Sequence, residues 1–328
     1  MLPVSLADVQ SALPRVREVL TPTLLNEWPG LSQQFGCRLY LKHENHQPVG
    51  AFKVRGGVNL VSSLTPAERE AGLLACSTGN HGQSLAFACS RAGVRCAIVV
   101  PEGNNPGKNR AIRLLGAELI EHGRDFDEAR DHVETVLQPE RRSRYVHSAN
   151  EPALIAGVAT MALEVFEVLP EPDVILVPIG LGSGVCGTSI VAKALRPETQ
   201  VIGVQAEQAS GVARAWQSGT MQPGDSAATW AEGMATRVPA SMTMAIMREL
   251  MDDVVLVSEE QLRQACWSIL TETHNLAEGA GAAAVAAVAA DPGRFAGKKV
   301  VAVLSGGNLD LTELPSILAA GRNSVTHG

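Results

Sequence analysis

The chain alternates short apolar runs rich in β-branched residues with longer segments of helical pattern, and this alternation restricts the fold more than any other feature. Runs expected to form strands occupy residues 73–77, 96–100, 118–121, 174–178, 201–207, 254–257 and 299–304. Segments expected to form helices occupy residues 82–92, 106–115, 126–137, 153–169, 185–195, 259–272 and 279–290. Several strand runs are apolar throughout, which is typical of parallel strands covered on both faces. The pattern therefore predicts an α/β fold with parallel sheets.

Length and composition limit the classes of protein to which the chain can belong. Its 328 residues suggest about two domains, with a boundary near residue 148, where a second βα series begins. Hydrophobic residues make up 45% of the chain, which excludes a disordered protein. The net charge of -7 argues against a nucleic-acid partner, because nucleic-acid-binding domains usually carry a basic face. The aperiodic segment 218–242 is expected to be a long loop.

The compartment expected from the sequence is the cytoplasm. The six cysteines are scattered and form no CxxC pair, as expected of reduced thiols in a cytosolic protein. The N-terminus has no basic stretch followed by an apolar run, so we expect no secretory signal. The Ala-rich segment 276–290 is too short and too weakly apolar to span a bilayer, so we expect no membrane partner.

Three Gly-rich turns each follow a predicted strand, and they are the candidate ligand-binding loops. They lie at Ser77–Gly82, Gly180–Gly184 and Ser305–Asn308. In α/β sheets, ligands bind at the carboxyl ends of the strands. The three loops are therefore expected to converge on one cleft.

The second of these turns overlaps a dinucleotide-binding pattern. Residues Gly182–Gly187 read G-x-G-x-x-G, they open a predicted helix, and Glu207 lies about 20 residues further on. By motif rules alone, this pattern favours a nicotinamide-dependent oxidoreductase. Backbone N–H groups at a helix N-terminus would hold a phosphate monoester equally well. The loop by itself leaves both ligands open, together with a purely structural glycine turn.

A lysine in the segment 42–57 has neighbours that suit a reactive amine. Gly50 and Ala51 are small enough for close backbone approach, and Phe52 offers a flat apolar face beside Lys53. An amine must be neutral to attack a carbonyl, and desolvation lowers the pKa of a lysine. Lys53 is therefore a candidate for forming a Schiff base.

Five motifs stand in a fixed order along most of the chain. They are K-x-E-x-x-x-x-V-G-A-F-K-x-R-G at 42–56, followed by Ser77–Gln83, Gly180–Gly184, Glu278–Ala282 and Ser305–Asn308. In these motifs the chain resembles the fold-type II pyridoxal-phosphate enzymes, and among them the serine/threonine dehydratase-like family. The resemblance implies a two-domain fold similar to tryptophan synthase β, with each domain an open, mostly parallel sheet flanked by helices. A smaller domain at 45–148 would carry the substrate carboxylate loop, and residues 1–44 with 149–328 would form the larger, cofactor-binding domain.

The resemblance further implies pyridoxal 5'-phosphate as the cofactor, and a role for each motif. Lys53 would form the Schiff base, and Phe52 would pack beside the cofactor ring. Asn80 would hydrogen-bond the phenolic oxygen, Ser305 would bond the pyridine nitrogen, and Glu278 would lie near the ring. The phosphate would be bound by the backbone amides of Gly180, Leu181, Gly182, Ser183 and Gly184. Taken singly, Ser77, Asn80 and Ser305 could also be no more than helix caps.

The reaction implied by the resemblance removes water and ammonia from a small β-hydroxy amino acid and yields a 2-keto acid. Lys53, once freed, would take the α-proton as general base. The substrate could be threonine or serine, or a less common compound such as 3-hydroxyaspartate or an ectoine-derived hydroxy-amino acid. Its carboxylate would be held by Ser77, Thr78, Gly79, Asn80 and His81. The resemblance also suggests a homodimer.

The sequence departs from the family pattern at several positions. Leu181 and Ser183 replace two glycines of the phosphate loop. Thr78 stands where many dehydratases have alanine and related racemases have serine, so its hydroxyl could act as an acid opposite Lys53. Racemisation or β-replacement on the same scaffold therefore remains an alternative, as does a non-catalytic binding protein. Glu207 lacks a second acidic ligand after it, so no bound metal is expected.

Overall fold

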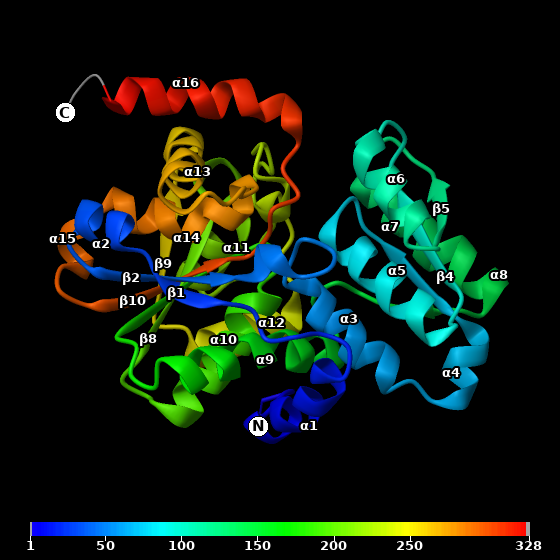
Figure 1. The fold of residues 1–328 in the computed structure, drawn as a ribbon. Coiled ribbons are helices and arrows are strands. Elements are labelled where there is room, and N and C mark those ends of the chain that lie inside the picture. Colours follow the sequence, from blue (N-terminus) through cyan, green and yellow to red (C-terminus); the bar gives the residue numbers. More distant parts are fainter. Residues whose placement is uncertain (1, 326–328) are drawn as a thin grey trace.

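The computed structural model describes residues 2–325, which form two bodies lying side by side (Figure 1). The larger body contains a six-stranded sheet in the order β1-β2-β10-β7-β8-β9. Its strands are β1 (Leu25–Glu27), β2 (Arg38–His43), β10 (Lys299–Leu304), β7 (Val174–Pro178), β8 (Gln200–Ala206) and β9 (Asp253–Val257). β1 pairs antiparallel with β2, and the other neighbours pair in parallel. The predicted α/β fold with parallel sheets is confirmed.

The smaller body contains a four-stranded parallel sheet in the order β5-β4-β3-β6. Its strands are β5 (Glu118–Glu121), β4 (Cys96–Val100), β3 (Leu73–Cys76) and β6 (Arg144–Tyr145). The helical segments around it are α4 (Pro66–Ala71), α5 (Asn80–Ala92), α6 (Pro106–Leu114), α7 (Phe126–His132), the π-helical turn η2 (Val133–Leu137) and α8 (Gln138–Arg141). This body lies within the predicted range 45–148, and we keep that range as a proposal for the domain boundary.

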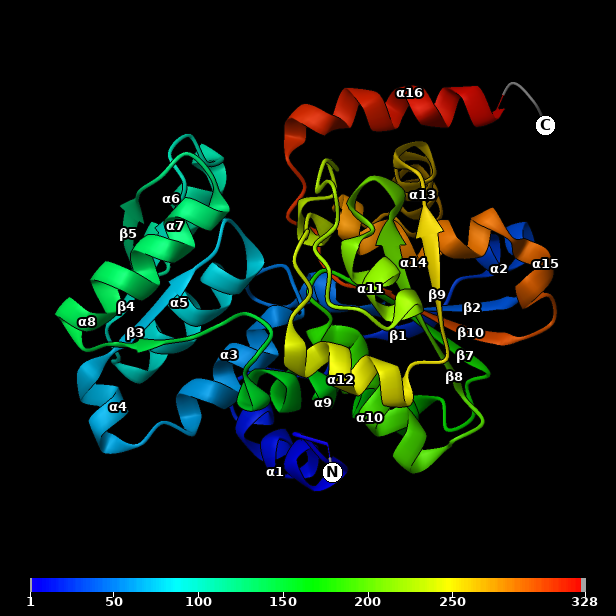
Figure 2. The same cartoon turned by 180° about the vertical axis from the view of Figure 1, so that it is seen from behind.

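Helices cover both faces of the larger sheet (Figure 2). On one side lie α1 (Leu6–Arg17), α9 (Pro152–Val168), α10 (Ser183–Leu195) and α12 (Ser241–Leu250), and on the other α2 (Pro29–Phe35), α13 (Glu259–Thr273), α14 (Gly279–Ala290) and α16 (Leu314–Val325). Successive strand residues point to opposite faces, so Ile175 joins the first core and Leu176 the second. The inner strands β2, β10, β7 and β8 are therefore buried on both sides, while the edge strands β1 and β9 are partly exposed. Within residues 2–325, no helix is long and apolar enough to cross a membrane.

Helix α3 (Lys53–Ser62) lies where the two bodies meet, between α9 of the larger body and α5 of the smaller one (Figure 1). Glycines let its backbone approach both neighbours closely. A Cβ at Gly56 would lie 2.9 Å from the carbonyl oxygen of Leu154 in α9, and one at Gly57 would lie 2.4 Å from Ser84 Oγ in α5. The helix that begins at Lys53 is therefore packed tightly between the two bodies.

The structure adds elements that the apolar pattern did not predict. The prediction missed β2 because the charged residue Lys42 interrupts its apolar pattern. It missed α3 because Gly56 and Gly57 are poor helix formers. The long loop expected at 218–242 is confirmed between α11 (Gly211–Ser218) and α12, apart from the short 3₁₀ turn η4 (Glu232–Met234). The remaining short elements are η1 (Glu44–His46), η3 (Glu207–Ala209), α15 (Pro292–Phe295) and η5 (Leu311–Glu313).

The close approach of α9 to α3 predicts that Gly157→Ala destabilises the fold. The new Cβ would lie 2.6 Å from the carbonyl oxygen of Arg55 and 2.8 Å from Gly56 Cα. We expect the free energy of unfolding in urea to fall by about 1–3 kcal/mol, because backbone atoms cannot yield as side chains do. Gly293→Ala is the control: its Cβ would meet no atom nearer than 3.6 Å, so a change within about 0.5 kcal/mol is expected. Equal stability of both variants would contradict this packing.

Candidate active site

The segment before Lys53 is attached to the loop that follows β10. The backbone N–H of Phe52 donates to Ser305 O at 3.0 Å, the N–H of Gly307 donates to Gly50 O at 2.9 Å, and Ala51 pairs with Gly306 as an antiparallel bridge. Close approach of the chains requires glycine, since a Cβ at Gly306 would lie 2.3 Å from Glu278 Oε1. These bonds bring two of the sequence-predicted motifs together at the carboxyl end of β10.

The Lys53 amine lies against the third motif. Its Nζ donates to Ser183 Oγ at 2.8 Å and lies 5.1 Å from the centroid of the Phe52 ring. The side chain keeps some solvent-accessible surface, yet enough protein surrounds it that desolvation lowers its pKa from 10.5 to about 8. A neutral amine is therefore accessible near neutral pH, as the neighbours of Lys53 led us to expect.

The loop Gly180–Gly184 follows β7 and includes the first residues of α10, so it lies at a helix N-terminus. Gly182 has a φ of +99°, the left-handed region that glycine adopts readily. α10 begins without a side-chain cap, so no side chain occupies the N–H groups of its first turn. A Cβ at Gly180 would lie 2.4 Å from Gly233 O, and one at Gly184 would lie 3.2 Å from the Phe52 ring. The loop is a tight cradle of main-chain donors, which suits an anion.

The two residues that depart from the glycine pattern have distinct surroundings. The carbonyl oxygen of Leu181 accepts a hydrogen bond from Thr243 Oγ1 at 2.6 Å, which fixes the loop from α12. Thr236 Oγ1 donates in the same way to Gly180 O at 3.0 Å. Ser183 directs its hydroxyl to Lys53. The loop is therefore held through its backbone carbonyl oxygens, and of the two departures it is the Ser183 side chain that joins the loop to the lysine.

The loop between β3 and α5 is shaped by Ser77. Its Oγ accepts hydrogen bonds from the backbone N–H groups of Gly79 at 3.3 Å and Gly82 at 2.9 Å. The Thr78 carbonyl oxygen accepts from Asn104 Nδ2 at 3.4 Å. His81 is buried, with its Nε2 3.4 Å from Val146 O, and desolvation lowers its pKa to about 3, so its imidazole is neutral. The helix-cap interpretation thus holds for the Ser77 side chain, while its substrate role stays a prediction.

Asn80 of the smaller body forms hydrogen bonds with the larger body. Its Nδ2 donates to Glu278 Oε1 at 2.8 Å, and its Oδ1 accepts from Asn308 Nδ2 at 2.8 Å. Burial raises the pKa of the Glu278 carboxyl, which favours its protonated form. Asn80 is therefore no simple helix cap, because both of its amide atoms bind residues of the larger body.

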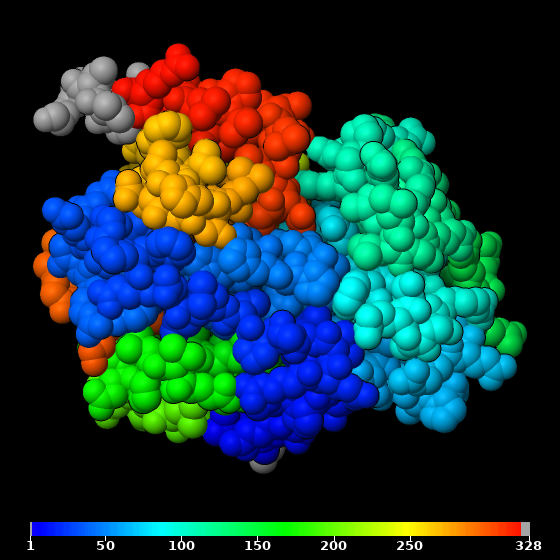
Figure 3. Space-filling model, in the orientation of Figure 1, coloured from blue at the N-terminus to red at the C-terminus, as the bar shows by residue number. Residues whose placement is uncertain are grey.

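A second pair of contacts also crosses between the two bodies. Lys108 of α6 forms an ion pair with Glu232 of η4, and Asn105 Nδ2 donates to Asp310 Oδ2 at 2.6 Å. In the space-filling view a furrow separates the smaller body from the C-terminal residues on this side (Figure 3). The structure thus brings all five motifs together where the two bodies meet.

Ser305 lies nearby but is not free of protein contacts. It is buried, and its Oγ donates to Ala280 O at 3.4 Å, a long hydrogen bond. A hydroxyl can exchange such a weak bond for a better acceptor. The expected partner of a ring nitrogen is thus placed beside Phe52 through their shared backbone hydrogen bond.

Sequence reasoning missed three residues that support the site. Ser84 Oγ donates to the carbonyl oxygen of Lys53 itself at 2.6 Å. Asn308 orients Asn80, and its place in the Ser-Gly-Gly-Asn motif could have indicated this. Glu164 lies on α9 and binds Arg55, and the only signal for it was that it is one of two acids, with Glu167, in an otherwise apolar helical run.

Comparison with known proteins places these features in one family. The model of the family described as pyridoxal-phosphate dependent enzyme matches residues 16–306. The catabolic L-threonine dehydratase of Escherichia coli strain K12 is 35% identical over 318 residues, covering 96% of each chain. The processed threonine deaminase isoform 2 of Solanum lycopersicum has a TM-score of 0.91 and 29% identity, covering 96% of this chain and 92% of that one. Serine racemase of Dictyostelium discoideum has a TM-score of 0.87 and 31% identity, covering 94% and 99%.

The lowered pKa of Lys53 predicts how its reaction with pyridoxal 5'-phosphate depends on pH. With a pKa of about 8, roughly a tenth of the amine is neutral at pH 7, against less than ~0.1% for an ordinary lysine. The rate of imine formation should therefore rise about tenfold between pH 7 and pH 9 and then level off. Nα-acetyl-lysine with the same aldehyde is the reference, and its rate should keep rising beyond pH 9. Parallel profiles for the protein and the reference would contradict the prediction.

Proposed function

Because the chain belongs to the family of pyridoxal-phosphate dependent enzymes, we propose that it removes water and ammonia from a small β-hydroxy amino acid and releases a 2-keto acid. The observation that carries this proposal is the Lys53 amine, which has a lowered pKa and is hydrogen-bonded to Ser183 at the start of α10. Relatives named as threonine dehydratase and threonine deaminase match nearly the whole chain. Threonine is therefore the first substrate to test, with serine second.

The residues of the site fit pyridoxal phosphate. Lys53 supplies an amine that can bind an aldehyde covalently. The cradle at Gly180–Gly184 supplies main-chain donors for a phosphate ester, and its tight fit against Gly233 leaves no room for a Cβ. Phe52 and Ser305 would flank the ring, and Asn80 would face its phenolic oxygen. When bound, this cofactor supplies an electron sink for the electron pair left at the α-carbon of the substrate.

Each step also needs groups of the protein. Lys53 would take the α-proton at Nζ, since roughly a tenth of its amine is neutral at pH 7, far more than for an ordinary lysine. The loop from Ser77 to His81, at the N-terminus of α5, would bind the substrate carboxylate through its backbone N–H groups. The β-hydroxyl leaves as water, and a water later replaces the nitrogen, so the net products are one keto acid and one ammonia.

Ser305 would determine the charge on the ring nitrogen. A neutral hydroxyl cannot compensate the positive charge of a protonated pyridine nitrogen as a carboxylate would. The ring nitrogen should therefore stay largely unprotonated. Glu278 lies close by, but burial raises its pKa and its Oε1 is bonded to Asn80. With this nitrogen unprotonated, the bound cofactor would supply a weaker electron sink, which would favour loss of the β-hydroxyl.

We propose racemisation as a second activity of the same site. Serine racemase of Dictyostelium discoideum shares the fold at 31% identity, and Thr78 offers a hydroxyl on the loop next to Asn80. If this hydroxyl lies opposite Lys53, it would return a proton to the other face of the α-carbon. The family match disfavours a nicotinamide-dependent oxidoreductase, although the loop contains a G-x-G-x-x-G pattern.

We also propose a homodimer in the cytoplasm. The family resemblance supports the dimer, and light scattering of the purified protein would test it. All six cysteines are free, and five of them are buried, as suits a reducing compartment.

The proposed dehydration predicts a defined outcome for Lys53→Ala. The wild-type protein should be yellow, and with L-threonine it should release equal amounts of 2-keto acid and ammonia. Lys53→Ala should lose at least ~10⁴-fold in kcat, because both the covalent attachment and the base are removed. Lys298→Ala, at the opposite end of β10, is the control and should keep full activity. Keto-acid release by Lys53→Ala at the wild-type rate would contradict the proposal.

The proposed racemisation predicts a different result for Thr78. Chiral chromatography should detect D-serine formed from L-serine by the wild-type protein. Thr78→Ala should reduce this product about 100-fold, the usual range for loss of a positioned acid, and leave keto-acid release within severalfold. Thr78→Ser keeps the hydroxyl and should retain both products. If Thr78→Ala made as much D-serine as the wild type, Thr78 would have no such role.

A further inference from the structure

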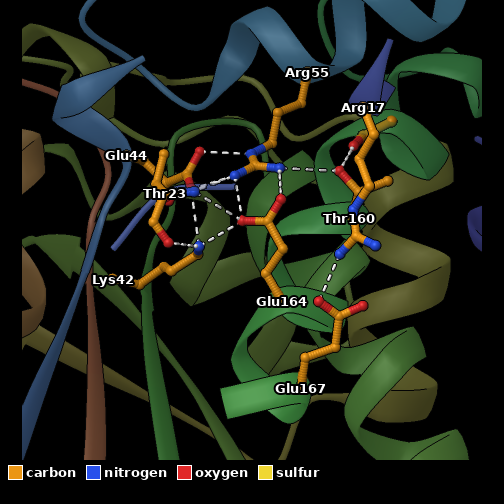
Figure 4. Close-up of polar contacts among 9 residues, drawn as sticks. Arg17, Thr23, Lys42, Glu44, Arg55, Thr160, Glu164 and Glu167 are labelled. Atoms are coloured by element: carbon orange, nitrogen blue, oxygen red, sulfur yellow. Dashed lines mark hydrogen bonds and ion pairs between the residues drawn. The ribbon is translucent and has the colours of Figure 1, made fainter. Parts of the chain in front are cut away.

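Three charged residues of the lysine motif have no part in the proposed chemistry, although they are buried. Lys42, Glu44 and Arg55 each have side chains that are fully inaccessible to solvent, and Glu164 of α9 joins them with 3% of its side chain exposed. We call these four residues the buried quartet (Figure 4). Charges are rarely buried without a strong compensating geometry, so the quartet requires an explanation.

Arg55 is the centre of the quartet. Its guanidinium forms a two-bond fork with Glu44, from Nε at 2.7 Å and from Nη2 at 2.8 Å. It forms a second fork with Glu164, from Nη1 at 2.6 Å and from Nη2 at 2.7 Å. Only a planar guanidinium can satisfy two carboxylates in this way. The position of Arg55 is therefore fixed from η1 on one side and from α9 on the other.

Lys42 completes the quartet and makes it electrically neutral. Its Nζ donates to Glu164 Oε2 at 2.5 Å and to Thr23 O at 2.8 Å. Thr23 Oγ1 donates to Glu44 Oε1 at 2.6 Å. Two cations and two anions thus compensate each other within one hydrogen-bonded network.

The quartet is linked to Lys53 through the first turn of α3. Arg55 is the third residue of α3, and Lys53 is the first, so both belong to the first turn of one helix. That turn has no side-chain N-cap. Instead, Arg55 holds it to the larger body, and Ser84 Oγ holds the Lys53 carbonyl oxygen from α5 at 2.6 Å. Both contacts fix the backbone that carries the Lys53 amine.

The effect of the quartet on Lys53 is one of position. The pKa of Lys53 is lowered by desolvation, and a neutral network adds no net charge behind it. We propose that Arg55, Glu44, Glu164 and Lys42 are positioning residues that set the first turn of α3, and so place the Lys53 amine for attack on the aldehyde. This inference rests on the proposed covalent role of Lys53, but on no particular substrate.

The test is Arg55→Lys in the full-length chain, which keeps the charge of the quartet and removes its forks. The measurement is the fraction of chains with a borohydride-trapped adduct at Lys53, by mass spectrometry, over a range of pyridoxal 5'-phosphate concentrations. We expect the half-saturating concentration to rise at least about tenfold, and kcat for threonine to fall about 10–100-fold while KM changes little, because small misplacement of a reacting group is costly. The adduct measurement does not depend on which amino acid the protein converts.

Two further variants make the outcome decisive. Thr23→Val removes the hydroxyl that donates to Glu44, at a partly exposed position, and should shift the half-saturating concentration in the same direction by a smaller factor. Glu167→Gln is the matched control, since Glu167 lies one turn beyond Glu164 on α9 and pairs at the surface with Arg17 (Figure 4). It should match the wild type. The inference would be wrong if Thr23→Val and folded Arg55→Lys both formed the adduct at the same half-saturating concentration as the wild type. A lower melting temperature as the only change would show that the quartet is purely structural.

Discussion

The candidate site depends on the first turn of α3 being fixed where the two bodies meet. The buried ion pairs of the quartet contribute much of this restraint. Removing one member of a buried ion pair typically costs about 3–5 kcal/mol, because the partner is left unpaired away from water. The forks between Arg55 and two carboxylates therefore tolerate little displacement of α3. A reactive lysine needs such a support, because its own side chain must stay uncharged and cannot be anchored by an ion pair.

The same arrangement explains why the motifs are spread over the whole chain. Parallel sheets place their loops at the carboxyl ends of the strands, and contacts between loops of the two sheets bring distant segments together. Asn80 follows β3 of the smaller sheet, while Asn308 follows β10 of the larger one, and a direct hydrogen bond joins them. The expected cofactor would lie among these loops, with the phosphate cradle on α10 and the substrate loop on α5.

The hydrophobic pattern was sufficient to predict β3, β4, β5, β7, β8, β9 and β10 and the helices that alternate with them, because continuous apolar runs are typical of strands covered on both faces. It failed where charge or glycine interrupts an element. Lys42 lies inside β2 and is satisfied by Glu164, which is 122 residues away in sequence. Gly56 and Gly57 lie inside α3, where neighbouring helices leave no space for a Cβ. Tertiary contacts outweighed local propensity at these positions.

The candidate site was predicted from its motifs, because the chemistry of an imine-forming lysine and of a phosphate cradle demands particular residue types next to each other in sequence. The sequence by itself determined which residues are candidates for that chemistry. Only the tertiary structure decided which loops face one another, that Ser183 meets Lys53, and that Ser84 and Arg55 hold the lysine from opposite sides. The reason is physical: desolvation and hydrogen bonding act between atoms that are close in space, and here those atoms come from residues between 31 and 130 positions apart in sequence.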